Sequence, residues 1–546
     1  MSKMMTVAAA VSILVVAGCG TGGETADTAN LKRFHDQDVD WKPCPPDLKA
    51  LGITDLDEKQ RALLDTRECA SVEVPVDYRD PDGERFTLPL ARIPAADPEK
   101  REGSLLLASG GPGLGGVDNT IQRPLTNPSL VQKYDLVGFD PRGVGKSEPA
   151  ITCLDDELVK KQVEVDTSPD TEAEIESLVA FQEDFTDGCR KRSGDILEHV
   201  GTVNVARDLD IVREVLGDKT LNYYGVSYGI QPGAMYAELF PKHTGRIVLD
   251  APGPILLDFE ESMRQQTKGI ELGLERFADN CVADNSCPLG DDRDAVLDGL
   301  STLFDELDAK PMPAADGASL TEADARMAIA IGVYDPHGWP KLEQALSDAT
   351  DGDPAGLYAM AGVMAGRDAS GGYSNFWEAN TAVNCVDYPD THDQGDVEKL
   401  AKEFDKLSPR FGIGNAWRLN ECATWPKGEG RTKELNGKGA KPILILGNTG
   451  DPDAIYAFAE QLAESLESAR LLTYHGEGHG AYGEGNDCVD GTVDKFLLDG
   501  TDPGEAATCR GLDAPAVAAG RVHFFGGNRT IMSPLGCSRS LVATHR

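Results

Sequence analysis

Residues 221–229 read Leu-Asn-Tyr-Tyr-Gly-Val-Ser-Tyr-Gly, and this stretch decides the fold that the sequence predicts. Its first half is an apolar run typical of a strand, its second half matches the pattern G-x-S-x-G, and a helical pattern follows to about Phe240. In this setting Ser227 sits on a sharp, strained strand-to-helix turn and projects its hydroxyl from the edge of a sheet. The pattern alone occurs by chance, whereas the flanking strand and helix make it specific. Ser227 is therefore a candidate nucleophile.

Further strands are predicted on both sides of this one along the chain. Alternating or continuous apolar runs predict strands at 71–78, 86–93, 104–108, 134–139, 246–250, 441–446 and 469–474. Helical spacing from Val203 to Leu216 ends at Gly217. Strands that alternate with helices predict an α/β fold with a mostly parallel sheet and helices on both faces. The alternation stops between about 254 and 440, so we expect a mainly helical cap inserted over one end of the sheet.

Composition excludes several classes of protein. The chain has 546 residues, of which 40% are hydrophobic, and its formal charge is −39 because 91 acidic residues outnumber 52 basic ones. A disordered chain would be less apolar. A polytopic membrane protein would contain several apolar runs of ~20 residues, which the body of this chain lacks. The acidic balance argues against binding to nucleic acid and is typical of a surface that keeps an exported protein in solution.

The first twenty residues indicate a targeting signal. Lys3 is the only charge before Glu24, and the apolar run from Thr6 to Val16 is too short for a stable transmembrane anchor. Small residues then precede Cys19, an arrangement that resembles the lipobox of bacterial lipoproteins and implies cleavage before Cys19 and lipidation of its thiol. The alternative is an ordinary secretory signal in which this cysteine is incidental. Both interpretations predict an exported protein.

The cysteine content agrees with export. Twelve cysteines less Cys19 leave eleven, and in an exported chain they are expected to form disulfides. Sequence alone does not fix their connectivity. The simplest hypothesis pairs neighbours and leaves Cys537 over, which gives Cys44–Cys69, Cys153–Cys189, Cys281–Cys287, Cys385–Cys422 and Cys488–Cys509. A zinc site is not expected, because it needs pairs as close as C-x2–4-C and five residues separate even Cys281 and Cys287.

A glycine-rich loop offers donors for an oxyanion. Ser-Gly-Gly-Pro-Gly at 109–113 directly follows the strand predicted at 104–108. Acyl transfer needs N–H groups aimed at the oxygen that becomes negative, and bare glycine backbone can supply them. We expect the amides of Gly111 and of Tyr228, the residue after the nucleophile, to form this oxyanion hole. A phosphate cradle is disfavoured, because no G-x-G-x-x-G opens a helix here and the chain is acidic.

A nucleophilic serine needs a base, and the base needs an acid to orient it. In this type of fold the acid and then the histidine follow the serine along the chain. Asp451 follows one predicted strand in Thr-Gly-Asp-Pro-Asp, and His479 follows the next in His-Gly-Glu-Gly-His. Both lie in loops that leave the carboxyl ends of strands. Asp453 remains an alternative acid and His475 an alternative base, while the two glycines between the histidines argue against a helical zinc motif.

Seven short motifs together carry a resemblance to a known family. They are Gly-Gly-Pro-Gly at 110–113, Asp-Pro-Arg-Gly-Val-Gly-Lys-Ser at 140–147, Gly-Val-Ser-Tyr-Gly at 225–229, Asn-Cys-Val-Asp at 384–387, Cys-Ala-Thr-Trp-Pro at 422–426, Thr-Gly-Asp-Pro at 449–452 and Gly-Glu-Gly-His-Gly at 476–480. From about Trp41 to Arg510 the chain resembles the secreted actinomycete tripeptidyl-aminopeptidase-like α/β hydrolases, relatives of the proline iminopeptidases. The stretch 441–510 is similar to the C-terminal module of that family.

The resemblance implies an α/β-hydrolase fold and a serine exopeptidase that removes short peptides or single residues from free N-termini. The chain departs from the family pattern at Ala108-Ser109, at Pro232 and at Asp453-Ala-Ile455, where Ala-Thr-Pro is typical. These departures bear on the pocket and the substrate more than on the triad. An aminopeptidase must also hold an α-ammonium, which a carboxylate of the cap does by a charge-assisted hydrogen bond. The candidates are Glu260, Glu261, Glu378 and Asp387, although most acids of the chain are expected to be solvated surface charges.

These observations combine into one expected organisation. It comprises a signal peptide at 1–18, a flexible tether at 19–40, the first part of the core at 41–253, the cap at 254–440, the second part of the core at 441–510 and a tail of unknown role at 511–546. We expect a monomeric, lipid-anchored or secreted serine hydrolase that acts on peptides without a metal or cofactor. The alternatives are an esterase or amidase for small acyl compounds and a non-catalytic peptide-binding lipoprotein. The intact set of serine, histidine, aspartate and glycine loop argues against the last.

Overall fold

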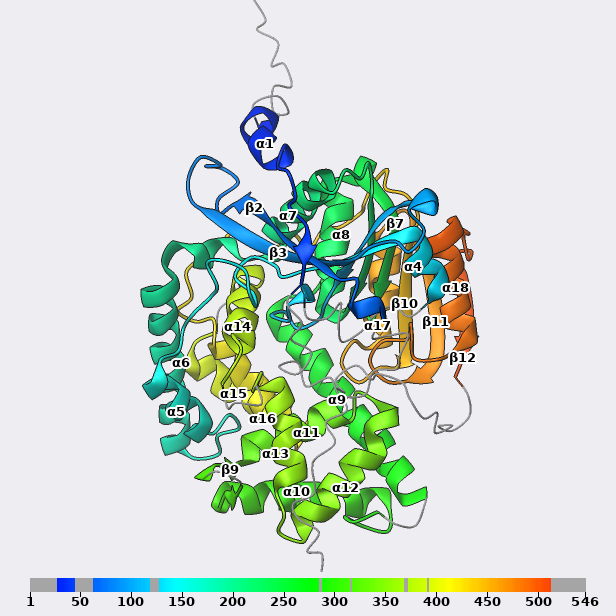
Figure 1. The fold of residues 1–546 in the computed structure, drawn as a ribbon. Helices are drawn as coiled ribbons and strands as arrows, with labels where there is room; N and C mark the ends of the chain where they lie inside the picture. Colours follow the sequence, from blue (N-terminus) through cyan, green and yellow to red (C-terminus); the bar gives the residue numbers. More distant parts are fainter. Residues whose placement is uncertain are drawn as a thin grey trace, which may run out of the picture.

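A computed structural model describes residues 27–44, 62–117, 127–283, 287–314, 317–367, 372–389 and 392–511. The signal peptide expected at 1–18, the lipidation expected at Cys19, the cysteine that the pairing hypothesis leaves over, Cys537, and the tail after residue 511 lie outside these described residues. The labels of the helices and strands follow Figure 1.

The core of the molecule is one ten-stranded sheet (Figure 1). In spatial order its strands are β1 (Lys42–Pro43), β2 (Glu68–Pro75), β3 (Arg85–Ile93), β5 (Tyr134–Phe139), β4 (Gly103–Ala108), β6 (Leu221–Val226), β7 (Thr244–Asp250), β10 (Ile443–Gly450), β11 (Ala469–Glu477) and β12 (Ala506–Arg510). All pairs from β5 to β12 are parallel, whereas β1, β2 and β3 pair antiparallel with their neighbours. The carboxyl ends of β4, β6, β10 and β11 therefore gather their loops at one edge.

Helices cover both faces of this sheet. They are α7 (Thr202–Val215), α8 (Ile230–Leu239) and α17 (Tyr456–Ser465) on one face, and α4 (Pro128–Lys133) and α18 (Asp487–Asp499) on the other. The neighbours Leu105 and Leu106 of β4 belong to the two opposite buried clusters, because side chains alternate along a strand. Burial on both faces explains why the central strands read as continuous apolar runs.

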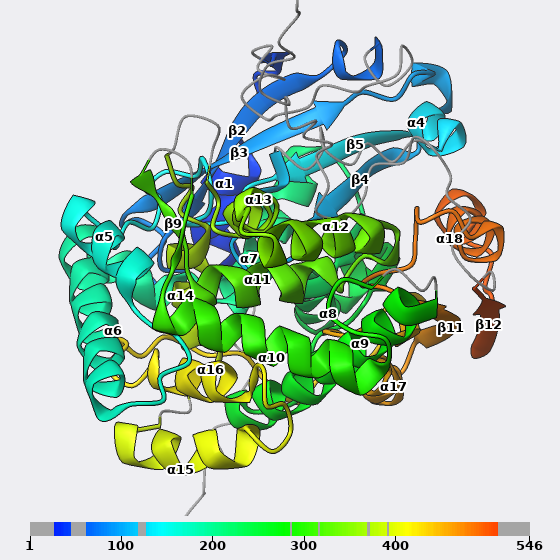
Figure 2. The ribbon, with the colours of Figure 1, turned by 90° about the horizontal axis from the view of Figure 1, so that it is seen from below.

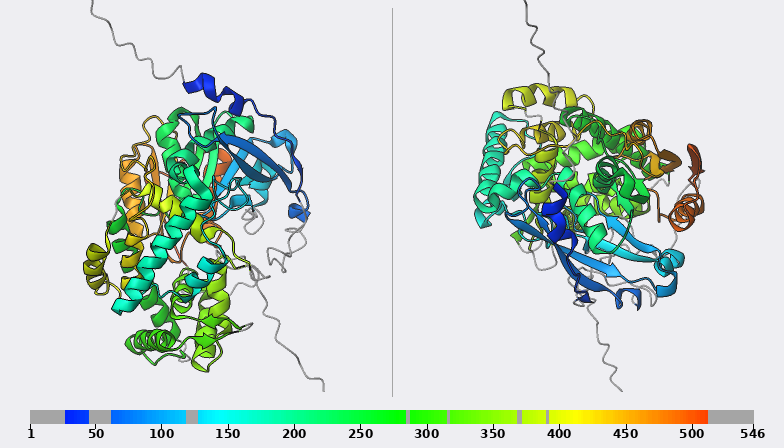
Figure 3. Two further views of the ribbon diagram at one scale, coloured as in Figure 1. Left: turned by 90° about the vertical axis from the view of Figure 1, so that its left-hand side faces the viewer. Right: turned by 90° about the horizontal axis from the view of Figure 1, so that it is seen from above.

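Between β7 and β10 the chain leaves the sheet and forms the helical insertion, residues 254–440. It contains α9 (Phe259–Ala283), α10 (Arg293–Ala309), α11 (Glu322–Gly332), α12 (Trp339–Thr350), α13 (Ala355–Met364), α14 (Phe376–Asp387), α15 (Gln394–Phe404), α16 (Gly412–Trp417) and the short strands β8 (Met312–Pro313) and β9 (Ser319–Leu320). Helices α9 to α13 share a hydrophobic core of their own. They lie below the sheet in Figure 1, face the viewer in Figure 2 and occupy the lower end of the left view in Figure 3.

A second helical segment lies beside the insertion. Helices α5 (Asp156–Glu164) and α6 (Glu172–Ser193) precede α7 in the chain and lie next to α14 and α16 (Figures 1 and 2). The side chain of Gln182 in α6 donates to the carbonyl oxygen of Trp417 at 3.2 Å and accepts from Asn420 at 2.6 Å. The residues of α5 and α6, which the sequence analysis assigns to the first part of the core, thus pack with the insertion.

The predicted α/β-hydrolase architecture is confirmed, because the predicted strands correspond to β2 through β7, β10 and β11 of a mostly parallel sheet. The flexible tether predicted at 19–40 is wrong for its described part. Residues Asp27–His35 form helix α1, and Phe34 is only 1% exposed. Phe34 belongs to the main core cluster, and the guanidinium groups of Arg33 and Arg85 lie over its ring at 4.7 and 5.9 Å. Burial of this single aromatic side chain fixes a segment whose polar composition suggested a tether.

Five disulfides cross-link the described residues. They are Cys44–Cys69, Cys153–Cys189, Cys281–Cys287, Cys385–Cys422 and Cys488–Cys509, the same five neighbour pairs as in the sequence hypothesis. Each closes a short stretch of chain within one region of the fold, so each stabilises a local unit by restricting the unfolded chain.

A fully buried ion pair ties the motif at 140–147 to the core. The guanidinium of Arg142 and the carboxylate of Asp208 in α7 are both inaccessible to solvent, and Nε donates to Oδ2 at 2.8 Å. Arg142 also donates to the carbonyl oxygens of Pro75, Val76 and His199 at 2.9–3.0 Å. With these partners the buried charge is satisfied, so Arg142 serves the fold rather than the reaction.

We predict that Arg142→Met destabilises the protein by about 3–5 kcal/mol, because it leaves Asp208 as a buried charge without its partner. The free energy of unfolding in urea, with the disulfides intact, measures this effect. The matched control is Arg79→Met, which removes an exposed guanidinium that pairs with Asp77 and should change stability little. Equal stability of the Arg142→Met variant and the wild type would contradict the prediction.

Candidate active site

The turn that carries Ser227 is built by two close approaches of backbone. Ser227 follows β6 and has a positive φ of 56°, a strained conformation for a residue with a side chain. A Cβ on Gly225 would lie 2.3 Å from the carbonyl oxygen of Gly229, and a Cβ on Gly229 would lie 2.6 Å from that of Ala108. Only glycine fits at both positions, which explains the two glycines of G-x-S-x-G in physical terms.

The glycine-rich loop after β4 lies directly against Ser227. A Cβ on Gly110 would be 3.0 Å from Cβ and 3.3 Å from Oγ of Ser227. Gly111 has a φ of 111°, and a Cβ there would lie 2.8 Å from the backbone nitrogen of Gly113. Bare backbone thus borders the hydroxyl, as an oxyanion site requires. The assignment of the Gly111 and Tyr228 amides as donors stays a prediction.

A small apolar cavity adjoins this loop and Tyr228. Its lining includes Pro112, Leu114, Val144, Val205, Tyr228 and Val383. The ring of Tyr228 is buried, and its hydroxyl forms a hydrogen bond of 2.8 Å with Thr202 Oγ1 at the start of α7. This contact fixes the peptide after Ser227 against α7.

His479 and Asp451 meet at the carboxyl edge of the sheet. Nδ1 of His479 lies 3.0 Å from each carboxylate oxygen of Asp451, and both side chains are buried. The loop after β10 also aims the backbone N–H groups of Asp453 and Ala454 at Asp451 Oδ1, at 2.9 and 2.8 Å. These bonds fix the carboxylate, which in turn fixes the orientation of the imidazole.

A further carboxylate holds the loop that carries the histidine. Asp250, at the carboxyl end of β7, is buried and accepts hydrogen bonds from the backbone N–H groups of Ala481 and Tyr482 at 3.0–3.2 Å. It also accepts from the hydroxyl of Tyr224 in β6 at 3.0 Å. Asp250 therefore links β6 and β7 to the segment that follows His479.

The electrostatic surroundings favour a charged imidazole. Burial by itself lowers the pKa of His479, but the adjacent carboxylate of Asp451, followed by those of Asp453 and Asp250, raises the pKa to about 9. The carboxylates around His479 therefore favour the protonated form of its imidazole. A base of this kind gains its neutral form, and with it its reactivity, as the pH rises toward 9.

The alternative acid lies on the opposite side of the imidazole. Asp453 Oδ2 is 4.0 Å from Nε2 of His479, whereas Asp451 faces Nδ1. The two carboxylates of this loop thus flank both ring nitrogens. Burial raises the pKa of Asp453, while nearby His479 lowers it. The alternative base His475 is exposed on β11.

The helical insertion contacts the same loops. The backbone N–H of His479 donates to the carbonyl oxygen of Tyr334 at 2.8 Å, and the rings of Tyr334 and His479 lie 5.3 Å apart. The amide of Gln266 in α9 donates to Asp453 Oδ1 at 2.8 Å, and the hydroxyl of Tyr334 donates to the same carboxylate. Residues from two parts of the insertion therefore complete the surroundings of the imidazole.

Two of the four carboxylates predicted to bind an ammonium have backbone partners instead. Asp387 accepts from the backbone N–H of Thr202 at 2.8 Å and from its hydroxyl, which caps the first turn of α7. Burial raises the pKa of Asp387 to about 6, against the lowering effect of these hydrogen bonds. Glu378 accepts from the backbone N–H groups of Cys153 and Leu154 at 2.7 and 2.9 Å. Both carboxylates thus position backbone of neighbouring segments.

The other two predicted carboxylates line an acidic cavity at the start of α9. Its lining comprises Asp258, Glu260, Glu261 and His392. Glu260 pairs with Arg264 at 2.9 Å and lies 3.3 Å from Nε2 of His392. This cavity is separate from the carboxylates that flank His479, although α9 passes both.

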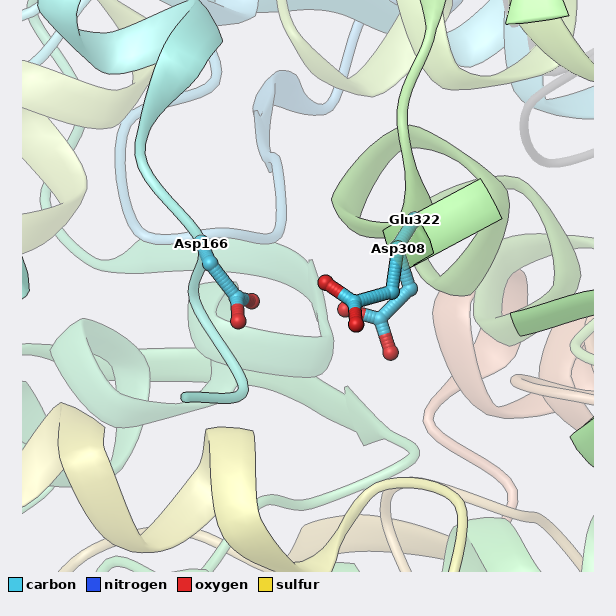
Figure 4. A group of neighbouring side chains, drawn as sticks. All are labelled: Asp166, Asp308 and Glu322. Atoms are coloured by element: carbon cyan, nitrogen blue, oxygen red, sulfur yellow. The ribbon is translucent and has the colours of Figure 1, made fainter. Parts of the chain in front are cut away.

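Two groups of carboxylates have the spacing of metal ligands, and they share Asp308: one is Asp166, Asp308 and Glu322, the other Asp170, Glu174 and Asp308. Figure 4 shows Asp166, Asp308 and Glu322 turned toward one another, with ligand atoms within 4.8 Å. Glu322 is already paired with Arg326 at 2.5 Å and accepts from Ser168 at 2.8 Å, and so its charge is balanced. The first group joins the segment after α5 to α10 and α11 and has no part in the site around His479.

Comparison with known proteins places the chain in a family. Residues 408–509 match the family model described as TAP-like protein. The chain is 33% identical over 520 residues to serine protease Hip1 of Mycobacterium tuberculosis, covering 92% of this chain and 96% of the relative. It is 35% identical over 456 residues to carboxylesterase B of the same organism, covering 81% and 86%. It is 32% identical over 486 residues to tripeptidyl aminopeptidase of Streptomyces lividans, covering 86% of each.

The fold, the serine turn and the paired histidine and aspartate define a serine hydrolase of the α/β-hydrolase class. The chain belongs to the family of tripeptidyl-aminopeptidase-like hydrolases, because the relatives above cover most of its length at more than 30% identity. The resemblance inferred from the seven motifs is thereby confirmed.

Three residues of the site escape the sequence analysis. Asp250 ends a predicted strand, and a polar residue at the carboxyl end of a parallel strand is a recognisable signal. Gln266 and Tyr334 carry no such signal, since they lie in the insertion and reach the loops after β10 and β11 only through the tertiary fold.

We predict that Asp166→Asn stabilises the protein near neutral pH by about 1 kcal/mol. Burial, followed by the charge of Glu322, raises the pKa of Asp166 from 3.8 to about 6. Between these two values the unfolded chain is ionised while the folded protein retains the proton, so stability falls as the pH rises through this window and stays lowered above it. The full pKa shift would correspond to a larger free energy. Water partly screens the carboxylate, because it is only partly buried, so the expected gain in stability is reduced to about 1 kcal/mol.

The difference in the free energy of unfolding between Asp166→Asn and wild type should vanish below about pH 4 and reach its full size above pH 6. Thermal unfolding across this pH range measures it. The matched control is Asp298→Asn, which removes an equal charge from the exposed side of α10 and should give no pH-dependent difference. A variant that is less stable than wild type at pH 7 would contradict the prediction.

Proposed function

We propose that this chain is an exported serine exopeptidase that hydrolyses peptide bonds near free N-termini. In this proposal Ser227 is the nucleophile, His479 the proton carrier and Asp451 the carboxylate that orients it. The observation that carries the proposal is the approach of both Asp451 oxygens to His479 Nδ1 at 3.0 Å, at the sheet edge where the strained turn presents Ser227. With Nδ1 engaged in this way, Nε2 is the nitrogen that exchanges a proton with the nucleophile.

The reaction proceeds through an acyl-enzyme. Ser227 Oγ bonds to the carbonyl carbon while its proton passes to His479 Nε2, and negative charge collects on the carbonyl oxygen, where we assign the amides of Gly111 and Tyr228 as donors. The C–N bond then breaks as Nε2 gives that proton to the leaving amine. Water next loses a proton to Nε2 and attacks the ester carbon, and the proton returns to Oγ as the acid product leaves.

The names of the relatives support peptides as substrates, because one is a serine protease and another a tripeptidyl aminopeptidase. Ester hydrolysis is a second candidate, since a relative named carboxylesterase B is 35% identical to this chain and the same triad chemistry cleaves esters. The N-terminus of the substrate separates the two: an aminopeptidase needs a free ammonium group, whereas an esterase does not.

We also propose that Cys19 carries a lipid and anchors a monomeric enzyme to the outer face of the cell membrane. Five disulfides support export, because the reducing cytosol disfavours them. Among the described residues, no helix combines the length and the apolar character needed to cross a membrane. An ordinary secretory signal would instead release the protein.

We predict that Ser227→Ala lowers kcat/KM for free-amine peptide p-nitroanilides by at least ~10⁴-fold, because the covalent step is lost. The wild type should cleave these amides and spare their N-acetylated forms. The matched control is Ser71→Ala, which changes an exposed serine of β2 and should retain full activity. Activity that persists in Ser227→Ala would refute the mechanism, and cleavage of esters alone would favour the second candidate.

We predict that labelling of Ser227 by an uncharged fluorophosphonate accelerates with pH up to about 9. The carboxylates around His479 raise its pKa to about 9, so the neutral, basic form of the imidazole grows about tenfold per pH unit below that value. The rate constant of inactivation, measured as a function of pH, follows this rise directly, because the reagent itself does not titrate. A rate that already levels off at pH 7 would contradict the prediction.

A further inference from the structure

Asp453 has an unusual place beside the reacting side of the imidazole. Its Oδ2 lies 4.0 Å from His479 Nε2, the nitrogen assigned above to proton transfer. Within the described part of the chain, His479 is the one basic side chain within salt-bridge distance of this carboxylate. The position of this carboxylate beside His479 Nε2 suggests a partner in the substrate.

Two neutral donors hold this carboxylate in place. The amide of Gln266 donates to Oδ1 at 2.8 Å, and the hydroxyl of Tyr334 donates to the same carboxylate. Neither donor brings a positive charge, so within the described ranges the charge of Asp453 is balanced by His479 alone. A fixed carboxylate that faces a reacting centre is suited to bind an ammonium group by a charge-assisted hydrogen bond.

The contact of α9 with the loop explains how Gln266 reaches Asp453. A Cβ on Gly269 would lie 2.5 Å from the carbonyl oxygen of Pro452, and a Cβ on Gly273 would lie 2.6 Å from Pro452 Cβ. These two glycines are four residues apart and share one face of the helix with Gln266, three residues before Gly269. The helix can therefore lie directly on Pro452, which places Gln266 over the next residue of the loop.

The reach of a substrate ammonium depends on how many residues precede the cleaved bond. In an aminoacyl substrate the α-nitrogen is two bonds from the attacked carbonyl carbon, roughly 2.5 Å, whereas each further residue adds up to ~3.3–3.6 Å. The attacked carbon lies next to Ser227 Oγ, which must itself come within hydrogen-bonding distance of Nε2. Asp453 is thus within reach of the ammonium of the attacked residue, but the N-terminus of a tripeptide extends ~7 Å further.

From this geometry we infer that Asp453 binds the α-ammonium of the residue whose carbonyl group Ser227 attacks, so that the enzyme releases single N-terminal residues. The inference rests on the proposed function and specifies its substrate class as peptides and amides with a free amine on the residue that is removed. The acidic cavity around Glu260 and Glu261 is the competing anchor. Glu260 in this cavity lies six residues before Gln266 on α9, about 9 Å along the helix axis. That distance suits a substrate with a longer segment before the cleaved bond.

The first test identifies the product released from a free hexapeptide by the wild-type enzyme. Mass spectrometry over time should show loss of one residue at a time. Initial loss of three residues would overturn the inference while leaving the serine exopeptidase intact. If the hexapeptide is not cleaved but p-nitrophenyl esters are, the proposed function itself fails, and the inference fails with it.

The second test compares Asp453→Asn with wild type on an aminoacyl p-nitroanilide and its N-acetylated form. We expect kcat/KM for the free amine to fall about 10–100-fold, mainly through KM, because a charge-assisted contact is lost. The preference for the free amine over the acetylated form should shrink by the same factor. The matched control is Glu460→Gln, which removes an exposed charge from α17 and should change neither value.

Labelling by a fluorophosphonate shows whether Asp453→Asn retains a folded, reactive triad. A variant that labels well but loses the preference for free amines supports the inference. A variant that labels well and keeps the preference overturns it, and Glu260→Gln then tests the competing anchor. Should Asp453→Asn fail to label, Gln266→Leu provides the second variant: it removes one donor to Asp453, and we expect a selective loss of about fivefold for the free amine. An equal loss on the acetylated substrate would overturn the inference.

Discussion

The imidazole of His479 lies between two carboxylates, and the rest of the site depends on that arrangement. One loop after β10 supplies both, with Asp451 3.0 Å from Nδ1 and Asp453 4.0 Å from Nε2. Two negative charges beside one buried ring stabilise its protonated form, which is why its pKa reaches about 9. The parallel sheet makes this possible, because it ends β6, β10 and β11 at one edge and holds their loops within contact.

The helical insertion takes part in the site as well as covering it. Gln266 and Tyr334 come from two of its segments and hold Asp453, while the carbonyl oxygen of Tyr334 accepts from the backbone of His479. The glycines of α9 that allow close contact with Pro452 make these bonds geometrically possible. The folding of the insertion and the geometry of the charged groups are therefore coupled, even though the insertion has a separate hydrophobic core.

Features set by local sequence could be predicted, and those set by tertiary contact could not. The strands around Ser227 follow from apolar runs, and Asp451 and His479 follow from their places after strands. Helix α1 was missed because its order comes from the burial of Phe34 against distant residues. The contact of Gln266 with Asp453 spans 187 positions, and no spacing rule reaches that far. Asp250 ends a predicted strand, so its place at the carboxyl edge of the sheet can be read from the sequence.

A crystal structure of the protein inactivated by an α-aminophosphonate ester with a free amine would test the central claim most directly. Such a reagent phosphonylates the nucleophile, and its phosphorus takes the place of the attacked carbonyl carbon. The ammonium group is bonded to the carbon next to the phosphorus. The account predicts a bond from phosphorus to Ser227 Oγ, a phosphonyl oxygen against the glycine-rich loop, and the ammonium on Asp453. Phosphorus on another residue, or an ammonium directed to the cavity around Glu260, would contradict it.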